Sequence, residues 1–294
     1  MPDIASFYSE VSRIVDAELD RLLPVAEVEP LRLHEAMRWS VFAGGKRFRP
    51  ALTIAVGRAF GMSDDKLLST AAAVEMIHTF SLIHDDLPAM DDDNMRRGKE
   101  TCHVKFDEST AILAGDALHA LAFKAIAEDE KLPVVARLQL IVGLASATAT
   151  PDGMVAGQQL DLEAEGRGGD VDIERIHSLK TGALINFSAR SGAMIAAADE
   201  SKIAVINEFA DQLGLLFQIT DDLLDMSQTS DVLGKTAGKD AAASKATYPG
   251  KYGFETATQM AADVHERAVS SLEPLGERAE LLREICGHIL SRTS

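Results

Sequence analysis

Two clusters of aspartates are the side chains in this sequence best suited to chemistry. The first contains Asp85, Asp86 and Asp91, and the second, 136 residues later, contains Asp221, Asp222 and Asp225. Each cluster follows a largely apolar run, and charged side chains rarely enter apolar elements without a partner. Oxygen-rich groups of this kind suit Mg²⁺, which proteins usually hold with one or two carboxylates plus substrate phosphates. The clusters therefore predict a metal site that also binds phosphate.

The two clusters differ in spacing. Asp221 and Asp225 are four residues apart, so on an α-helix they share one face, where a divalent cation would relieve their repulsion. A solvated acidic helix end is the alternative interpretation. Asp85 and Asp91 are six residues apart and would lie on different faces of a regular helix. Pro88 lies between them and is expected to end the helix, which would let Asp91 fold back towards Asp85.

Basic residues are expected to hold the anions at such a site. The turn GGKRFRP puts cations beside a predicted helix start, where backbone N–H groups, Lys46 and Arg49 would bind an anion. Arg96 and Arg97 follow the first aspartates and would hold phosphate directly. Lys180 lies inside an apolar helical pattern and therefore needs a partner. The alternatives are a glycine stop with incidental surface charge, and an arginine pair that only neutralises the acidic run.

Together these features indicate two anionic groups, one bridged by metal to the aspartates and the other held mainly by arginine and lysine. This arrangement fits a reaction in which a metal-bound diphosphate leaves and a second diphosphate substrate attacks. A Ca²⁺- or Mg²⁺-binding structural protein without turnover is a competing interpretation, but it gives the basic residues no role. His78 shares a helix face with Asp85, although a lone histidine is more often part of a core than a ligand.

Composition narrows the class of protein. The chain has 294 residues and a net charge of −17, which argues against nucleic acid as a partner. Its two cysteines, Cys102 and Cys286, form neither a disulfide framework nor a zinc motif. The N-terminus lacks the features of a signal peptide, and the longest uncharged stretch, 138–151, is too short to span a bilayer. A soluble cytoplasmic protein without membrane insertion is expected.

Apolar residues recur at helical spacing almost everywhere, and no segment alternates with period two over any length. The pattern predicts one all-α domain over residues 1–294, without a linker. Two polar segments, 91–104 and 228–250, follow the aspartate clusters and are expected to be loops beside the site. Helices are expected at an amphipathic N-terminus and over 31–43, 50–61, 63–87, 108–128, 133–149, 151–165, 172–197, 200–227, 253–272 and 274–291.

The sequence resembles the trans-isoprenyl diphosphate synthases, most closely those of the bacterial farnesyl diphosphate type. The resemblance extends from about Gly44 to Pro249 and includes GGKRFRP, EMIHTFSLIHDDLPAMDDDNMRRGKETCHVKF, ILAGDAL, GQQLDLEAEG, KTGAL, FQITDDLLD and GKTAGKDAAASKATYP. It implies an all-α isoprenoid-synthase bundle around a deep central cavity, usually a homodimer. The implied cofactor is Mg²⁺, three ions per active site, with Mn²⁺ as a substitute.

The same resemblance assigns roles to residues by position. Metal would be held by Asp85, Asp91, Asp221 and Asp225, with Asp86 and Asp222 supporting. The allylic diphosphate would be held by Arg96, Lys180, Lys235 and Lys245. Isopentenyl diphosphate would be held by Lys46, Arg49, His78 and Arg97. The residues near the reacting carbons would be Lys180, Thr181 and Gln218.

Product length is expected to depend on Phe80, five residues before Asp85 and about 7.5 Å from it along a helix. A bulky ring there, with small Ser81 beside it, could cap the cavity that receives the growing tail. In the resembled family an aromatic at this position accompanies C15 products, so farnesyl diphosphate is predicted. The alternatives are a C20 geranylgeranyl product with Phe80 as ordinary core, a class I terpene cyclase, and a non-catalytic subunit of a two-component synthase.

Overall fold

The computed structural model describes residues 3–164, 171–227 and 247–293, and these residues are almost entirely helical, as predicted. The α-helices are α1 (Ile4–Leu22), α2 (Leu31–Val41), α3 (Phe48–Ala59), α4 (Asp64–Asp85), α5 (Cys102–Lys105), α6 (Glu108–Ala127), α7 (Val134–Thr148), α8 (Met154–Ala164), α9 (Ile173–His177), α10 (Ala183–Ile195), α11 (Glu200–Ser227), α14 (Tyr248–Tyr252), α15 (Phe254–Ser271) and α16 (Glu280–Leu290). A π-helical turn, η1 (Ser178–Gly182), joins α9 to α10, and 3₁₀ turns occupy η2 (Glu273–Ala279) and η3 (Ser291–Thr293).

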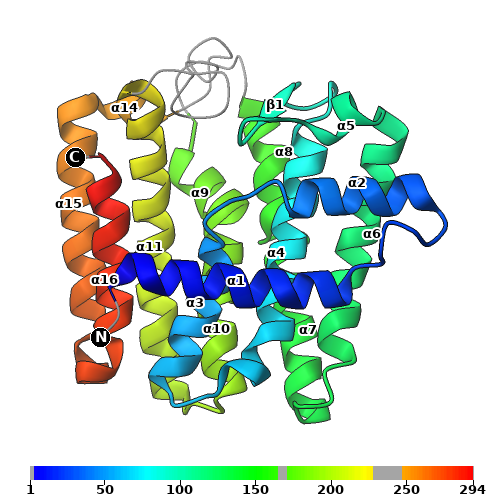
Figure 1. Cartoon of the computed structure of the whole chain (residues 1–294). Coiled ribbons are helices and arrows are strands. Elements are labelled where there is room, and N and C mark those ends of the chain that lie inside the picture. Colours follow the sequence, from blue (N-terminus) through cyan, green and yellow to red (C-terminus); the bar gives the residue numbers. More distant parts are fainter. Residues whose placement is uncertain (1–2, 165–170, 228–246, 294) are drawn as a thin grey trace.

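Helix α4 is the central element of the bundle. Its residues from Leu67 to Ile77 are almost all buried, so it packs on several sides rather than along one stripe. Helix α6 packs along it, α3 packs against α4 and α10, and α11 packs between α10 and α15. In Figure 1, α1 crosses the front of these helices, while α15 and α16 form one side and α6 and α7 the other.

The predicted boundaries differ from the structure in three places. The helix expected over 172–197 is interrupted by the π-helical η1. The single helix expected over 274–291 begins as a 3₁₀ turn instead, because Gly276 adopts a positive φ of 58° that no α-helix accommodates. The polar segment 91–104 contains a short antiparallel hairpin, β1 (Met95–Arg96) and β2 (Lys99–Glu100), together with the start of α5.

Two helices, α4 and α6, are long and apolar enough to cross a membrane, contrary to what the uncharged stretches suggested. The apolar window of α4 is 67% buried inside the protein, so its hydrophobicity is explained by the core. The window of α6 is only 39% buried, and Ile112 and Leu113 are exposed on it. Helix α6 therefore presents an apolar face that the described part of this chain leaves uncovered.

Candidate active site

The first aspartate cluster lies where α4 ends. The Asp91 N–H donates to the Asp85 carbonyl at 2.8 Å, and the Asp93 N–H donates to the Asp86 carbonyl at 3.1 Å. The chain therefore turns back at Pro88 and returns Asp91 to the helix end, which confirms the expectation from the six-residue spacing. In Figure 1 this end of the bundle, marked by β1, is also the end where α14 lies.

The carboxylates of this cluster have different environments. The pKa of Asp85 is raised to about 6, mainly by burial; Lys180 and Arg96 act to lower it, and the charges of Asp91 and Asp86 act to raise it. Asp86 is 3% exposed and accepts from Arg96 Nε at 2.8 Å, and Arg96 Nη2 lies 2.6 Å from the same oxygen. The ionised form of Asp85 is thus costly here, as expected where a cation is to be bound.

The second cluster lies on the last turns of α11. Asp221 and Asp225 are half-buried, whereas Asp222 between them is buried. Within the described ranges, no three carboxylate, imidazole or thiol side chains are grouped closely enough to hold a metal by themselves. A cation bound here would therefore draw further ligands from its substrate, which is the habit of Mg²⁺ with phosphates, and the carboxylate oxygens present suit that ion.

The π-helical η1 connects the two clusters. Lys180 is close enough to Asp85 to lower its pKa, and the next residue, Thr181, donates from Oγ1 to Gln218 Oε1 at 3.2 Å. Gln218 is one helical turn before Asp222 on α11. The residues predicted to lie near the reacting carbons are therefore brought together between the two acidic clusters.

The partner that Lys180 needs is Asp161 on α8. Lys180 Nζ donates to Asp161 Oδ2 at 2.6 Å, with side chains only 22% and 17% exposed. Gly157, one turn earlier on α8, makes this possible, because a Cβ there would overlap the backbone of Lys180. Asp161 is a site residue that sequence reasoning missed, although its segment, GQQLD, was part of the resemblance.

The predicted isopentenyl diphosphate residues are brought together in the structure. Lys46, Arg49, His78 and Arg97 all line one cavity of 140 Å³. Gly45 allows the approach of Arg97, since a Cβ there would collide with the Arg97 guanidinium, and Arg97 Nη1 donates to the Gly44 carbonyl. Glu75 in the same lining is paired with Arg47, so the charges of Lys46, Arg49 and Arg97 make the cavity a site for an anion.

Burial tunes the charges in this cavity. The pKa of Arg49 is lowered to about 10, mainly by burial; Glu75 and Asp221 act to raise it, and Arg97 acts to lower it. Burial and the same guanidinium groups hold the pKa of His78 well below its ordinary value, so His78 is neutral. Arg49 Nη1 lies 3.5 Å from His78 Nε2, which can accept from it. Cations that repel one another in a buried site are stabilised when an anion binds.

Arg47 also lines this cavity, but its guanidinium is already paired with carboxylates of the protein. Its backbone is left-handed, with φ of 46°, and its side chain is turned into the protein. Arg47 Nε donates to Asp16 Oδ1 at 2.8 Å and Nη1 donates to Glu75 Oε1 at 2.7 Å. The sequence suggested three cations at this helix start, but Arg47 is already neutralised and has a structural role.

Arg292 is a further cation at this cavity that no sequence signal marked. It lies 5.3 Å above the Phe217 ring, which in turn stacks on Phe48 at 5.0 Å, and its Nη2 is 3.6 Å from Asp221 Oδ1. It also lines the cavity with Lys46, whose pKa burial lowers and Arg292 lowers further. The C-terminal end of the chain thereby reaches both the anion cavity and the second aspartate cluster.

Phe80 packs within a group of aromatic rings between α4 and α6. Its ring meets His84 and His119 edge to face, each at 5.0 Å, and His119 meets Phe123 at 5.1 Å. Ser81 is small, and its Oγ donates to the His78 carbonyl at 2.9 Å. Lys235 and Lys245, the remaining predicted ligands, lie outside the described residues.

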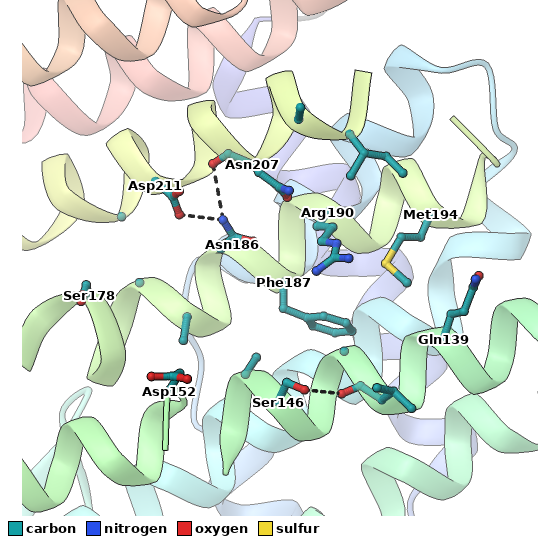
Figure 2. A pocket seen from close by; sticks show the side chains of 18 of the residues that line it. Gln139, Ser146, Asp152, Ser178, Asn186, Phe187, Arg190, Met194, Asn207 and Asp211 are labelled. Atoms are coloured by element: carbon teal, nitrogen blue, oxygen red, sulfur yellow. Dashed lines mark hydrogen bonds between the residues drawn. The ribbon is translucent and has the colours of Figure 1, made fainter. Parts of the chain in front are cut away.

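A groove of 1640 Å³ lies elsewhere, between α7 on one side and α10 and α11 on the other (Figure 2). Val135, Leu138 and Val142 line its α7 side, while opposite them Asn186 Nδ2 donates to Asp211 Oδ1 at 2.7 Å. Among the described residues that line the groove, none belongs to either aspartate cluster or to the cation cavity. The groove therefore excludes both clusters and the cation cavity, although Ser178 and Gly182 of η1 are part of its lining.

Comparison with known proteins finds relatives along most of the chain. Residues 30–284 match the family model described as polyprenyl synthetase. The farnesyl diphosphate synthase of Escherichia coli (strain K12) is 47% identical over 267 residues, 88% of each chain. The chloroplastic heterodimeric geranylgeranyl pyrophosphate synthase large subunit 1 of Arabidopsis thaliana is 44% identical over 92% of this chain and 74% of that one. The geranyltransferase of Helicobacter pylori, solved with magnesium and isoprenyl diphosphate, is 32% identical and matches with a TM-score of 0.86 over 99% of this chain and 97% of that one.

Proposed function

This chain belongs to the polyprenyl synthetase family and is a trans-prenyltransferase, and we propose that it condenses isopentenyl diphosphate with dimethylallyl and geranyl diphosphate to form farnesyl diphosphate. One observation carries the proposal. Four residues from three separate segments line a single cationic cavity, and η1 brings Lys180 close to Asp85 near it. Two anions can therefore be held side by side, as a condensation of two diphosphates requires.

We assign the cavity to the diphosphate of isopentenyl diphosphate. Arg49 and Arg97 supply guanidinium donors, Lys46 supplies an ammonium group, and neutral His78 supplies a hydrogen bond without further charge. Arg292 lines the same cavity and is assigned to the same anion. The stacked rings of Phe48 and Phe217 beside it offer an apolar surface for the five-carbon chain.

We assign the space between the aspartate clusters to the allylic diphosphate, with Arg96 and Lys180 as its direct cations. The carboxylates proposed to hold Mg²⁺ are Asp85, Asp91, Asp221 and Asp225. When bound, that ion supplies Lewis-acid neutralisation of the charge that develops on the leaving diphosphate. A count of three ions and the participation of Lys235 and Lys245 remain predictions from the family resemblance.

The chain's own residues guide the reacting carbons. The Thr181 hydroxyl donates a hydrogen bond to Gln218. The lone pairs of the Thr181 oxygen are then available to face the positive charge that develops on the allylic carbon. Holding both substrates in adjacent sites removes much of the entropic barrier to their union. The departing diphosphate is the base we propose for the final proton, since it stays beside the new bond.

We propose that Phe80 limits the product to fifteen carbons. Its ring is fixed on two sides by His84 and His119, so it can act as a rigid end to the space in which the tail grows. The 44% identity to a geranylgeranyl synthase shows that overall similarity alone does not separate the C15 product from the C20 alternative. The ring at position 80 is the feature that favours C15.

We also propose that a second copy of this chain covers α6 and α7. Along α7, Val134, Val135, Leu138 and Val142 are 57% to 69% exposed, and α7 packs beside α6, which also exposes apolar side chains. So many exposed large apolar side chains on neighbouring helices favour a surface that a partner covers. The whole chain would then act as one domain in each subunit of a homodimer, in the cytoplasm and without entering a membrane.

Product analysis tests the proposed function directly. Purified protein is incubated with isopentenyl diphosphate and either dimethylallyl or geranyl diphosphate, with and without Mg²⁺, and the products are dephosphorylated and separated by chromatography. Farnesol from both starters, only with Mg²⁺, is expected. Hydrocarbon from farnesyl diphosphate alone would indicate a cyclase, and no product from the single chain would indicate a non-catalytic subunit.

A further inference from the structure

Asp222 differs from the aspartates on either side of it. It is 5% exposed, and both of its carboxylate oxygens accept hydrogen bonds from the protein. Gln218 Nε2 donates to Oδ1 at 2.8 Å, and the Tyr248 backbone N–H donates to Oδ2 at 2.9 Å. Consecutive residues on an α-helix point about 100° apart, so Asp221 can face a substrate while Asp222 faces the interior.

The bond to Gln218 determines what Gln218 presents to η1. A glutamine amide is planar, with a donor at one end and an acceptor at the other. Because Nε2 is directed to Asp222, Oε1 is directed to Thr181, from which it accepts at 3.2 Å. Asp222 therefore fixes the orientation of the Gln218 amide, and an amide oxygen that faces Thr181 requires the Thr181 hydroxyl to donate.

The hydrogen bond between Asp222 and the Tyr248 backbone also connects Asp222 to η1, through the Tyr248 ring. The Tyr248 side chain is fully buried, and its ring stacks on His177 at 5.6 Å with an interplanar angle of 25°. His177 immediately precedes η1, which carries Lys180 and Thr181. Asp222 is thus connected to η1 by two routes. One runs through Gln218 to Thr181 within η1, and the other runs through Tyr248 to His177 at the start of η1.

The geometry points to Asp222 as a positioning residue that braces η1, and not as a metal ligand. This inference rests on the proposed function, because η1 is what holds Lys180 and Thr181 between the two substrates. Asp86 offers a parallel in the first cluster, where the second aspartate of the pair is buried against Arg96. In each pair, the first aspartate is assigned to the metal and the second to the orientation of a neighbouring functional group.

Exchange of the carboxylate and the amide between positions 222 and 218 tests whether Asp222 positions η1. In Asp222→Asn, the new amide nitrogen faces a donor, and in Gln218→Glu, two carboxylates face each other. The double variant combines both changes, so the introduced glutamate can accept from both the introduced asparagine and Thr181. The asparagine oxygen still accepts from the Tyr248 N–H, so the three hydrogen bonds named above are restored at unchanged net charge. We expect kcat to fall about tenfold in each single variant and to recover to within about threefold of wild type in the double variant.

Two further measurements separate positioning from metal binding. Calorimetric titration with inorganic diphosphate at varied Mg²⁺ should show a half-saturating Mg²⁺ concentration within about twofold of wild type for Asp222→Asn, but raised about tenfold for Asp225→Asn. Hydrogen exchange at the Tyr248 amide should accelerate about tenfold in Asp222→Ala and stay unchanged in Asp225→Asn, because Asp222 is the residue that accepts from that amide.

The outcomes are distinct. Asp222→Asn that raises the Mg²⁺ requirement as much as Asp225→Asn, or a double variant without recovery, would overturn the assignment. Wild-type protein that binds no diphosphate with Mg²⁺ would instead overturn the proposed function. Exchange at the Tyr248 amide would still report on the brace in that case, since it depends on neither metal nor substrate.

Discussion

Lys180 Nζ and Asp161 Oδ2 lie 2.6 Å apart, and this pair joins the site to a helix that sequence reasoning had left without a role. Lys180 also acts electrostatically on Asp85. Asp161 therefore holds the ammonium group at the edge of the acidic cluster, where an allylic diphosphate can reach it, and keeps it from pairing with the metal-binding carboxylate itself.

The loss of Asp161 should weaken allylic binding. In Asp161→Asn the Lys180 ammonium group is expected to move towards Asp85 and compete with metal there. We expect the KM for geranyl diphosphate to rise about tenfold, with a smaller change for isopentenyl diphosphate. Glu163→Gln is the matched control, because Glu163 is exposed on the same helix and bonds to Gln159. Equal KM values in the two variants would contradict this role for Asp161.

The stability of the metal-free protein should depend on Asp85 with a definite sign. The pKa of Asp85 is about 6 in the folded protein, against an ordinary value of 3.8, so the folded state holds the proton more tightly. The stabilisation is complete below about pH 4 and is lost as pH rises through about 6. We therefore expect Asp85→Asn to raise the free energy of unfolding at pH 7 by about 2 kcal/mol and to change it little at about pH 4. Urea unfolding without divalent ions measures both values.

The control for that experiment is an exposed carboxylate far from the site. Glu266→Gln on α15 removes the same charge without the buried environment, and its effect should be within about 0.5 kcal/mol at either pH. An Asp85→Asn variant that is less stable than wild type at pH 7 would contradict the prediction. It would show that Lys180 and Arg96 stabilise the ionised Asp85 by more than its burial costs.

Arg292 should affect one substrate and not the other. It lines the cavity assigned to isopentenyl diphosphate, so Arg292→Ala removes one cation from that anion. We expect the KM for isopentenyl diphosphate to rise about fivefold to tenfold, with the KM for geranyl diphosphate unchanged. Arg283→Ala, on the preceding helix and paired with Glu280, controls for a general effect on the C-terminus. A parallel rise in both KM values would instead indicate that Arg292 acts through its ion pair with Asp221 and not on isopentenyl diphosphate alone.

Removal of the Phe80 ring should lengthen the product. Phe80→Ala opens space bounded by His84 and His119, and chromatography of the dephosphorylated products should show geranylgeraniol in addition to farnesol. The loss of packing should cost about 2 kcal/mol of stability. Phe254→Ala is the control, because that ring is exposed at the start of α15. An unchanged product would return Phe80 to an ordinary place in the core.

A charge on the apolar face of α7 should separate the subunits. Leu138→Glu places a carboxylate where an apolar partner surface is proposed, and light scattering after size exclusion should show a monomer. Val28→Glu is the control, since Val28 is also half exposed but precedes α2, away from α7. A wild-type protein that is already monomeric would contradict the proposed interface.

Much of the fold and several site features could be predicted because they depend on local geometry. Helical periodicity repeats about every 3.6 residues, so the amphipathic and buried helices were readable from the sequence. The end of α4 before Pro88, the return of Asp91 to Asp85, and the shared face of Asp221 and Asp225 each involve residues within one or two turns. Gly276 is an exception, because the helical periodicity continues through it while its positive φ interrupts the helix expected over 274–291.

The tertiary structure alone decided which distant side chains meet. Asp161 lies 19 residues from Lys180, and Tyr248 lies 26 residues from Asp222, yet each pair is hydrogen bonded. Spacing along the chain could not tell that Arg47, which lines the cavity with Lys46 and Arg49, is already paired with Asp16 and Glu75. The sequence determined which residues could do this chemistry. Packing of whole helices determined which of them face substrate and which are held by the protein, because a buried charge must find its partner wherever the helices bring one.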